Sequence, residues 1–116
     1  MKLTVLLTKP PYGSIQAAEA VRHVMGAVGE EIDVKLLLVD EGVYLAKKGQ
    51  EAGTTEYTSL EEALKDIIDM GGEVFIDKAS LRDSGLDRED IIEGVEVVNS
   101  YDISQVLIDT DKTMIF

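Results

Sequence analysis

Residues 74–86, with the sequence VFIDKASLRDSGL, hold the side chains best placed to do chemistry in this chain. The apolar run at 74–76 is followed at once by Asp77, Lys78 and Ser80, a pattern typical of a buried strand that leads into a helix. In open α/β sheets, ligands and catalytic side chains gather outside the carboxyl ends of the strands. This pattern therefore predicts that Asp77 lies at the centre of a candidate site.

The chemistry expected of Asp77 is that of a helix cap. Aspartate is among the best residues at the N-cap, where its carboxylate accepts a hydrogen bond from a backbone N–H. A carboxylate used in this way is a poor proton donor, so we do not expect general acid catalysis. Ser80 and Ser84 have no histidine near them in the sequence, and the single His23 is expected on a solvated helix face. We therefore assign no catalytic residue and consider enzyme activity the least favoured function.

A metal or cofactor is not expected either. Asp40, Glu41, Asp77 and Asp102 could gather at one rim, but their spacing matches no known loop for Mg²⁺ or Ca²⁺. The chain has one histidine and no cysteine, which leaves little for a transition-metal site. No glycine-rich phosphate-binding motif is present in the sequence.

A second strand-to-helix joint lies at residues 10–14, after the first apolar run. Backbone N–H groups at the start of a helix, with Lys9 nearby, could receive a small anion, although Ser14 is more simply a helix cap. In a parallel sheet both joints open on the same edge. The candidate rim for a ligand or an interface therefore consists of Tyr12, Gly13, Ser14, Asp40, Asp77, Lys78, Ser80 and Arg82.

The elements that must position this rim alternate regularly along the chain. Apolar runs predict strands at residues 2–8, 33–39, 73–76, 95–98 and 113–116. Helical spacing and caps predict helices that start at Ser14, at Leu60 after a Ser59 cap, at 78, at 87 and at 100. Residues 47–58 have no clear period and are expected to form a surface loop. This alternation predicts a three-layer α/β/α, Rossmann-like doubly wound fold with a parallel sheet of about five strands.

The helical spacing also predicts which side chains point inward. Ile15 and Val21 share a broad apolar face on the first helix. On the last helix Ile103, Val106 and Leu107 are expected to face the sheet.

Composition limits the function classes. A chain of 116 residues with 45% hydrophobic content is expected to form a single domain over residues 1–116. Its formal charge of −12 would repel a phosphate backbone, so we expect no direct nucleic-acid binding and no anionic membrane surface as a partner. The first apolar run is too short for a signal peptide and is interrupted by Lys9, Pro10 and Pro11, so the expected compartment is the cytoplasm.

Several short motifs resemble the DsrE/DsrF (TusD/TusC) family of small sulfur-relay proteins, in the right order over nearly the whole chain. The motifs are Pro11-Tyr12-Gly13-Ser14, Glu19-Ala20, Asp40-Gly42-Val43, Ala79-Ser80-Leu81-Arg82 with Gly85-Leu86, and the final Met114-Ile115-Phe116. The likeness is greatest to the DsrF/TusC branch. It implies a small α/β protein that assembles into trimers, hexamers or hetero-hexamers, with a persulfide-bearing cysteine after strand three. Asp77 stands in that cysteine's place, and a carboxylate cannot attack or hold a persulfide.

Two functions remain open at this point. The chain could be a non-catalytic DsrF/TusC-like subunit that packs beside cysteine-bearing DsrE-like and DsrH-like subunits in an intracellular sulfur relay. Alternatively, it could be a homo-oligomer, a trimer or hexamer, that binds a small ligand or anion at the carboxyl edge of the sheet. The residues around Leu81, Ile91 and Ile92 could supply contact surface or could simply pack in the core.

Overall fold

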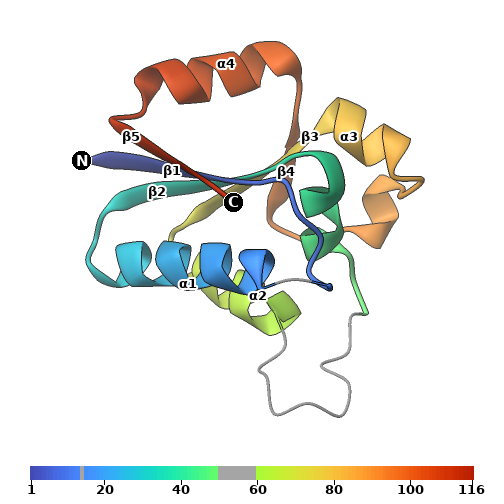
Figure 1. The fold of residues 1–116 in the computed structure, drawn as a ribbon, viewed down its shortest axis with the longest axis horizontal. Helices are drawn as coiled ribbons and strands as arrows, with labels where there is room; N and C mark the ends of the chain where they lie inside the picture. Colours follow the sequence, from blue (N-terminus) through green and yellow to red (C-terminus); the bar gives the residue numbers. More distant parts are fainter. Residues whose placement is uncertain (14, 50–59) are drawn as a thin grey trace.

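Five parallel strands form the centre of the computed structural model, which describes residues 1–13, 15–49 and 60–116 (Figure 1). The strands are β1 (Lys2–Leu7), β2 (Asp33–Leu38), β3 (Glu73–Asp77), β4 (Val95–Val98) and β5 (Lys112–Ile115), in the sheet order β4-β3-β2-β1-β5. Every neighbouring pair is parallel. The predicted sheet is confirmed, and each predicted strand end lies within one residue of the observed end.

Helices cover both faces of the sheet. Figure 1 shows α1 (Gln16–Gly29) and α2 (Leu60–Asp69) on one face and α4 (Ser100–Asp109) on the other. The steps from β1 to β2 to β3 run in one direction across the sheet, whereas the step from β4 to β5 runs back. Right-handed crossovers therefore place α4 on the opposite face from α1 and α2, and the three-layer doubly wound prediction is confirmed.

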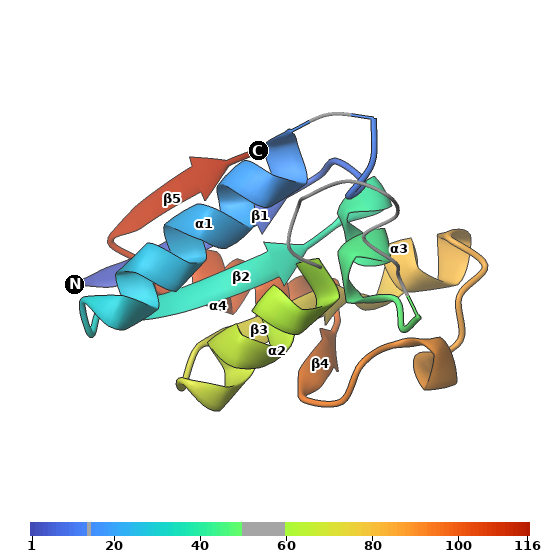
Figure 2. The ribbon, with the colours of Figure 1, turned by 90° about the horizontal axis from the view of Figure 1, so that it is seen from below.

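Three short helices lie where the strands end. They are η1 (Asp40–Ala46), α3 (Lys78–Asp83) and η2 (Arg88–Asp90), of which η1 and η2 are 3₁₀ helices. In Figure 2, which views the sheet through α1 and α2, η1 and α3 lie side by side beyond the tips of β2 and β3. These connections build the carboxyl edge at which a site was predicted.

The main core lies between the sheet and the pair α1 and α2. Successive strand side chains point to opposite faces, so Leu3, Val5 and Leu7 of β1 enter this core. Five small or β-branched side chains of α1 are buried against them: Ala17, Ala20, Val21, Val24 and Ala27. Leu81, Ile91 and Ile92 are also buried in this core, so packing is the use that the structure shows for them.

The predictions for the start of α1 need correction. Ile15 was expected to face inward, but it is the N-cap of α1 and its side chain is 70% exposed. This position precedes the first helical turn, so the helical spacing does not yet apply to it. The predicted caps Ser14 and Ser59, and most of the predicted loop at 47–58, lie outside the described residues.

A second and much smaller core lies under α4. Its buried members are Leu37, Phe75 and Val98, and Ile103 and Val106 of α4 pack against them. No residue of α4 is itself buried. Leu107 was expected to point inward, but it is 37% exposed, because the sheet face under α4 accepts only a narrow side of the helix. Within the described chain, no helix is both long enough and apolar enough to cross a membrane.

Candidate functional site

Asp77 ends β3 and caps α3, as the sequence predicts. Its backbone is extended, with φ −68° and ψ 122°, and its last strand pairing is with Val98 of β4. Its Oδ2 accepts hydrogen bonds from the Ser80 N–H over 3.2 Å and from the Ser80 hydroxyl over 2.6 Å. The carboxylate is therefore held as an acceptor at the start of α3.

The Ser80 hydroxyl also reaches the end of the neighbouring strand. The backbone N–H of Asp40, which follows β2, donates to Ser80 Oγ over 2.9 Å. Asp40 has a φ of +51°, and aspartate is one of the few residues besides glycine that enters this left-handed region readily. Asp40, Ser80 and Asp77 thus form a continuous hydrogen-bonded chain across the ends of two strands.

Gly42 allows η1 to lie this close to the sheet. A Cβ atom at this position would be 2.1 Å from the carbonyl oxygen of Leu7, which is backbone and cannot move aside cheaply. The same Leu7 oxygen accepts the N–H of Val39 over 3.0 Å, and the Gly42 N–H donates to the Val39 oxygen over 2.9 Å. Close backbone approach therefore fixes the start of η1 over the tips of β1 and β2.

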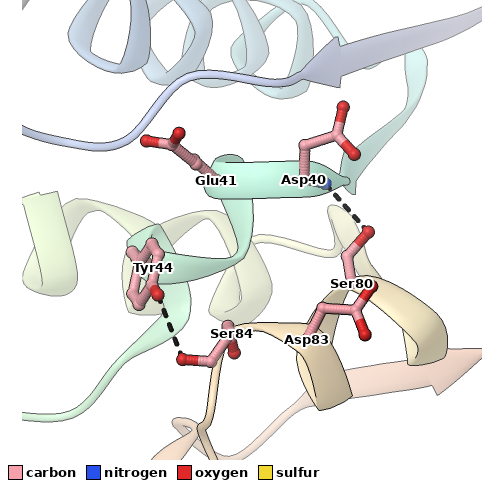
Figure 3. A pocket seen from close by; sticks show the side chains of 6 residues that line it. All are labelled: Asp40, Glu41, Tyr44, Ser80, Asp83 and Ser84. Atoms are coloured by element: carbon pink, nitrogen blue, oxygen red, sulfur yellow. Dashed lines mark hydrogen bonds between the residues drawn. The ribbon is translucent and has the colours of Figure 1, made fainter.

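A cavity of about 220 Å³ lies between η1 and α3. Figure 3 shows the six side chains that line it: Asp40, Glu41, Tyr44, Ser80, Asp83 and Ser84. Sites for drug-sized molecules and cofactors usually measure roughly 300 to 1,000 Å³. The cavity is therefore suited to a single side chain or a very small ligand.

The hydroxyl groups of this cavity already donate hydrogen bonds. The Tyr44 hydroxyl donates to the Ser84 carbonyl oxygen over 3.0 Å (Figure 3), and the Ser84 hydroxyl donates to the Leu81 carbonyl oxygen over 2.6 Å. The Ser80 hydroxyl donates to Asp77, as described above. The single histidine, His23, lies on α1 with its Nδ1 atom 2.8 Å from the Glu19 carbonyl oxygen. No histidine is placed to activate these hydroxyls, so the geometry does not support a hydrolytic site.

The lining is acidic. Asp40, Glu41 and Asp83 contribute three carboxylates. Asp83 pairs with Arg82, whose Nε lies 3.9 Å from Asp83 Oδ1, and both of these side chains are more than three quarters exposed. Such a pair is strongly screened by solvent. Within the described ranges, no group of three or more histidine, cysteine, aspartate or glutamate side chains is arranged to hold a metal ion. The carboxylates therefore disfavour anions, and the cavity favours a neutral or cationic group.

The structure brings together three members of the predicted rim, Asp40, Asp77 and Ser80. Of these three, Asp40 and Ser80 line the cavity, whereas Asp77 is hydrogen-bonded to Ser80 and does not line it. The other described members of the rim do not line it either. Lys78 and Arg82 are exposed on α3, and Tyr12 and Gly13 are exposed in the loop after β1. Ser14 lies outside the described residues.

Four lining residues lie outside the candidate rim named from the sequence: Glu41, Tyr44, Asp83 and Ser84. A signal for two of them was available, because Ser80, Asp83 and Ser84 have the spacing i, i+3 and i+4 that places side chains on one face of a helix. Glu41 and Tyr44 line the cavity because of the position of η1 beside α3, and this contact joins segments far apart in the sequence.

The whole chain matches a known family. A model of the DsrE/DsrF-like family matches residues 1–116 of the chain. The chain belongs to the DsrE/DsrF-like family.

Relatives of this DsrE/DsrF-like chain extend over its full length. An uncharacterized protein of Methanocaldococcus jannaschii is 34% identical over 116 residues, which is 100% of both chains. The intracellular sulfur oxidation protein DsrF of Allochromatium vinosum is 27% identical over 130 aligned positions, covering 99% of this chain and 96% of the relative.

Two solved structures share the fold. The crystal structure of the ychN protein from E. coli matches with a TM-score of 0.88 and 24% identity, and covers 100% of both chains. A protein of unknown function from Methanobacterium thermoautotrophicum matches with a TM-score of 0.72 and 15% identity over 96% of both chains. The family's parallel sheet with helices on both faces is therefore the fold of this chain.

Proposed function

We propose that this DsrE/DsrF-like chain is a non-catalytic, DsrF/TusC-like subunit of an intracellular sulfur-relay assembly and does not itself carry persulfide. The observation that carries this proposal is the state of Asp77, whose carboxylate caps α3 through Ser80. The resemblance to the DsrE/DsrF (TusD/TusC) family implies that catalytic members carry the sulfur-bearing cysteine at this position. Sulfur transfer needs a thiolate that attacks a persulfide and later leaves, and a carboxylate does neither. The sequence contains no cysteine elsewhere that could replace it.

The surroundings of Asp77 support the same proposal. A thiolate or a persulfide anion at this place would lie beside the acidic cavity lined by Asp40, Glu41 and Asp83. Like charges at short range disfavour the anionic form of a sulfur nucleophile. The acidic surroundings therefore disfavour a sulfur-carrying thiolate at this place, and the chain has no cysteine to supply one.

The fold gives this chain a different use in such an assembly. The network of Asp77, Ser80 and Asp40 holds η1 and α3 in fixed positions at the carboxyl edge of the sheet. A rigid edge of this kind can present the acidic cavity to a cysteine-bearing DsrE-like or DsrH-like subunit. Full-length similarity to a protein named for intracellular sulfur oxidation supports this class of partner.

The test is co-expression with cysteine-bearing subunits encoded beside this chain, followed by native mass spectrometry. We expect a hetero-oligomer that contains this chain. After incubation with a cysteine persulfide donor and ³⁵S label, we expect covalent label on the partner and none on this chain. The variant Asp77→Cys provides a thiol at the same place, and we expect it to accept far less label than the partner's cysteine.

Covalent sulfur on the unmodified chain would overturn the proposal that it is not a carrier. A homo-oligomer that ignores every cysteine-bearing neighbour would instead favour the alternative function, a self-assembled module that binds a small ligand at the same edge. In that case the acidic lining directs ligand trials toward neutral and cationic compounds before anions.

A further inference from the structure

A second cavity, larger than the acidic one, lies beside α2, the helix in front of β3 in Figure 2. Its volume is about 510 Å³, within the range of roughly 300 to 1,000 Å³ that is usual for sites of small organic ligands. One wall is a side of α2 on which Glu61, Lys65 and Asp69 follow one another at intervals of four residues. The rest of the lining comes from two segments outside α2: Lys48, Gly49, Ile92 and Glu93.

The wall opposite α2 is a short antiparallel pair of segments. The Lys48 N–H donates to the Asp90 carbonyl oxygen over 2.8 Å, and the Ile92 N–H donates to the Ala46 carbonyl oxygen over 3.0 Å. Ile92 is only 1% exposed, so it is the most deeply buried part of the lining. These backbone hydrogen bonds fix the wall against the main core.

Two close contacts join this wall to α2. Near the start of the helix, the Gly49 N–H donates to Glu61 Oε1 over 2.8 Å. Near its end, Gly94 has a φ of +93° and lies so close to α2 that an added Cβ would be 2.9 Å from the Cγ2 methyl of Ile68. Glycine meets both requirements without strain. The distance between the two walls is therefore set by the fold.

The cavity contains charges of both signs that the fold leaves unpaired. Among the described residues, neither Lys48 nor Lys65 forms an ion pair, although Lys65 lies one helical turn from both Glu61 and Asp69. The Glu61 carboxylate accepts the Gly49 N–H instead. Asp69 and Glu93 also have no ion pair within the described ranges. Two ammonium groups and two carboxylates are therefore available in one cavity.

We propose that this cavity binds a free amino acid with an apolar side chain. The two lysines can receive its carboxylate, and Asp69 and Glu93 can receive its ammonium group. Lys65 and Asp69 are about 6 Å apart along the helix axis, so together they can meet two ligand charges that share one carbon atom. The apolar side chain of the ligand gains contact with the buried Ile92.

The balance of charges decides the class of ligand. A purely anionic compound would be repelled by the carboxylates of the cavity, and a purely cationic one by its lysines. A molecule that carries both charges is attracted by both groups. The cavity shares no lining residue with the acidic cavity, so this proposal stands independently of the sulfur-relay proposal.

Titration with L-leucine, followed by the amide chemical shifts in NMR spectra of the ¹⁵N-labelled protein, tests the cavity. Two analogues serve as matched controls, because isocaproate lacks the ammonium group of leucine and isoamylamine lacks the carboxylate. We expect leucine to give saturable shifts at the lining residues with a Kd of about 1 mM, and each analogue to bind about tenfold more weakly. The proposal is wrong if leucine gives no saturable shifts up to about 20 mM, if the shifts lie elsewhere, or if either analogue binds equally well.

Variants of α2 provide the second test. Lys65→Met removes the ammonium group and keeps an unbranched side chain, and Asp69→Asn removes the charge with little change of shape. We expect each to raise the Kd for leucine about fivefold or more. Lys78→Met and Asp66→Asn make the same changes at residues that do not line the cavity, and all four residues are exposed, so the fold should tolerate each change. Equal effects of the lining and control variants would rule out binding in this cavity.

Discussion

The backbone N–H of Asp40 donates to Ser80 Oγ over 2.9 Å, although the two residues are 40 positions apart in the chain. This bond joins the ends of β2 and β3, because the same hydroxyl donates to Asp77 at the end of β3. One serine thus fixes the relative positions of η1 and α3. The shape of the acidic cavity between them depends on this contact.

Replacing Ser80 with alanine should destabilise the fold by about 1 kcal/mol, since the hydrogen bonds of its hydroxyl to Asp40 and Asp77 are lost while its N–H still contacts the cap. Urea denaturation measures the free energy of unfolding. The control is Ser104→Ala, because the exposed Ser104 hydroxyl donates only to the Tyr101 carbonyl oxygen within its own helix. Equal effects of the two variants would show that Ser80 does not join the strands.

Thr4 offers a stabilising substitution. It is 1% exposed in β1, and its hydroxyl has no hydrogen-bond partner among the described residues. Thr4→Val keeps the shape and removes the buried hydroxyl, so we expect the free energy of unfolding to rise by about 1 kcal/mol. Thr8→Val is the matched control and should lower it by a similar amount, because the Thr8 hydroxyl donates to the Phe116 carbonyl oxygen over 2.8 Å. A loss of stability in Thr4→Val would indicate a buried water that satisfies the hydroxyl.

Gly42→Ala should destabilise the protein by at least about 3 kcal/mol, because its methyl group would collide with the Leu7 carbonyl oxygen at 2.1 Å. Gly26 provides the contrast. A Cβ atom there meets nothing within 4 Å, and alanine is the better helix former by up to about 1 kcal/mol. Thermal denaturation should therefore show a lower melting temperature for Gly42→Ala and a higher one for Gly26→Ala. A tolerated alanine at Gly42 would mean that η1 can move away from the sheet.

The ion pair of Lys2 and Asp109 predicts that the free energy of unfolding depends on pH in the acidic range and again in the basic range. The hydrogen bond from Lys2 lowers the pKa of Asp109 below its ordinary 3.8, and the hydrogen bond to Asp109 raises the pKa of Lys2 above its ordinary 10.5. The Asp109 contribution to stability is therefore present above pH 3.8 and lost as the pH falls through the lowered pKa. The Lys2 contribution is present below pH 10.5 and lost as the pH rises through the raised pKa.

Carboxyl-carbon NMR titration measures the Asp109 midpoint directly. We expect a midpoint below 3.8 in the wild type and a return to the ordinary value in Lys2→Met. High salt should move the Asp109 midpoint part of the way back to its ordinary value, because both side chains are exposed to solvent and salt screens the pair. An Asp109 midpoint unchanged by Lys2→Met would show that the pair does not persist in solution.

The sequence alone predicted the elements well, because their signals are local. The strand predicted at residues 95–98 matches β4 at both ends, the helix predicted to start at 100 begins there as α4, and the Asp77 cap is confirmed. Capping side chains act within one turn, and strand and helix periods are read over a few residues. The same local signals failed at Ile15 and Leu107. Their exposure depends on where a helix starts and on how much of it the sheet covers.

The sheet order and the site were decided by tertiary structure. No local pattern in the sequence indicates that β5 pairs with β1, or that α4 therefore lies on the other face from α1 and α2. The packing of Gly42 against Leu7 is likewise a contact between distant residues. The acidic cavity combines η1 and α3, whose residues Asp40 and Ser80 are 40 positions apart, so the place of Tyr44 in its lining could be identified only in the folded chain. The sequence by itself determined the family, the parallel α/β class and the aspartate at the end of β3. Tertiary packing decided which side chains share a cavity and which stay exposed, because those relations depend on contacts between residues far apart in the chain.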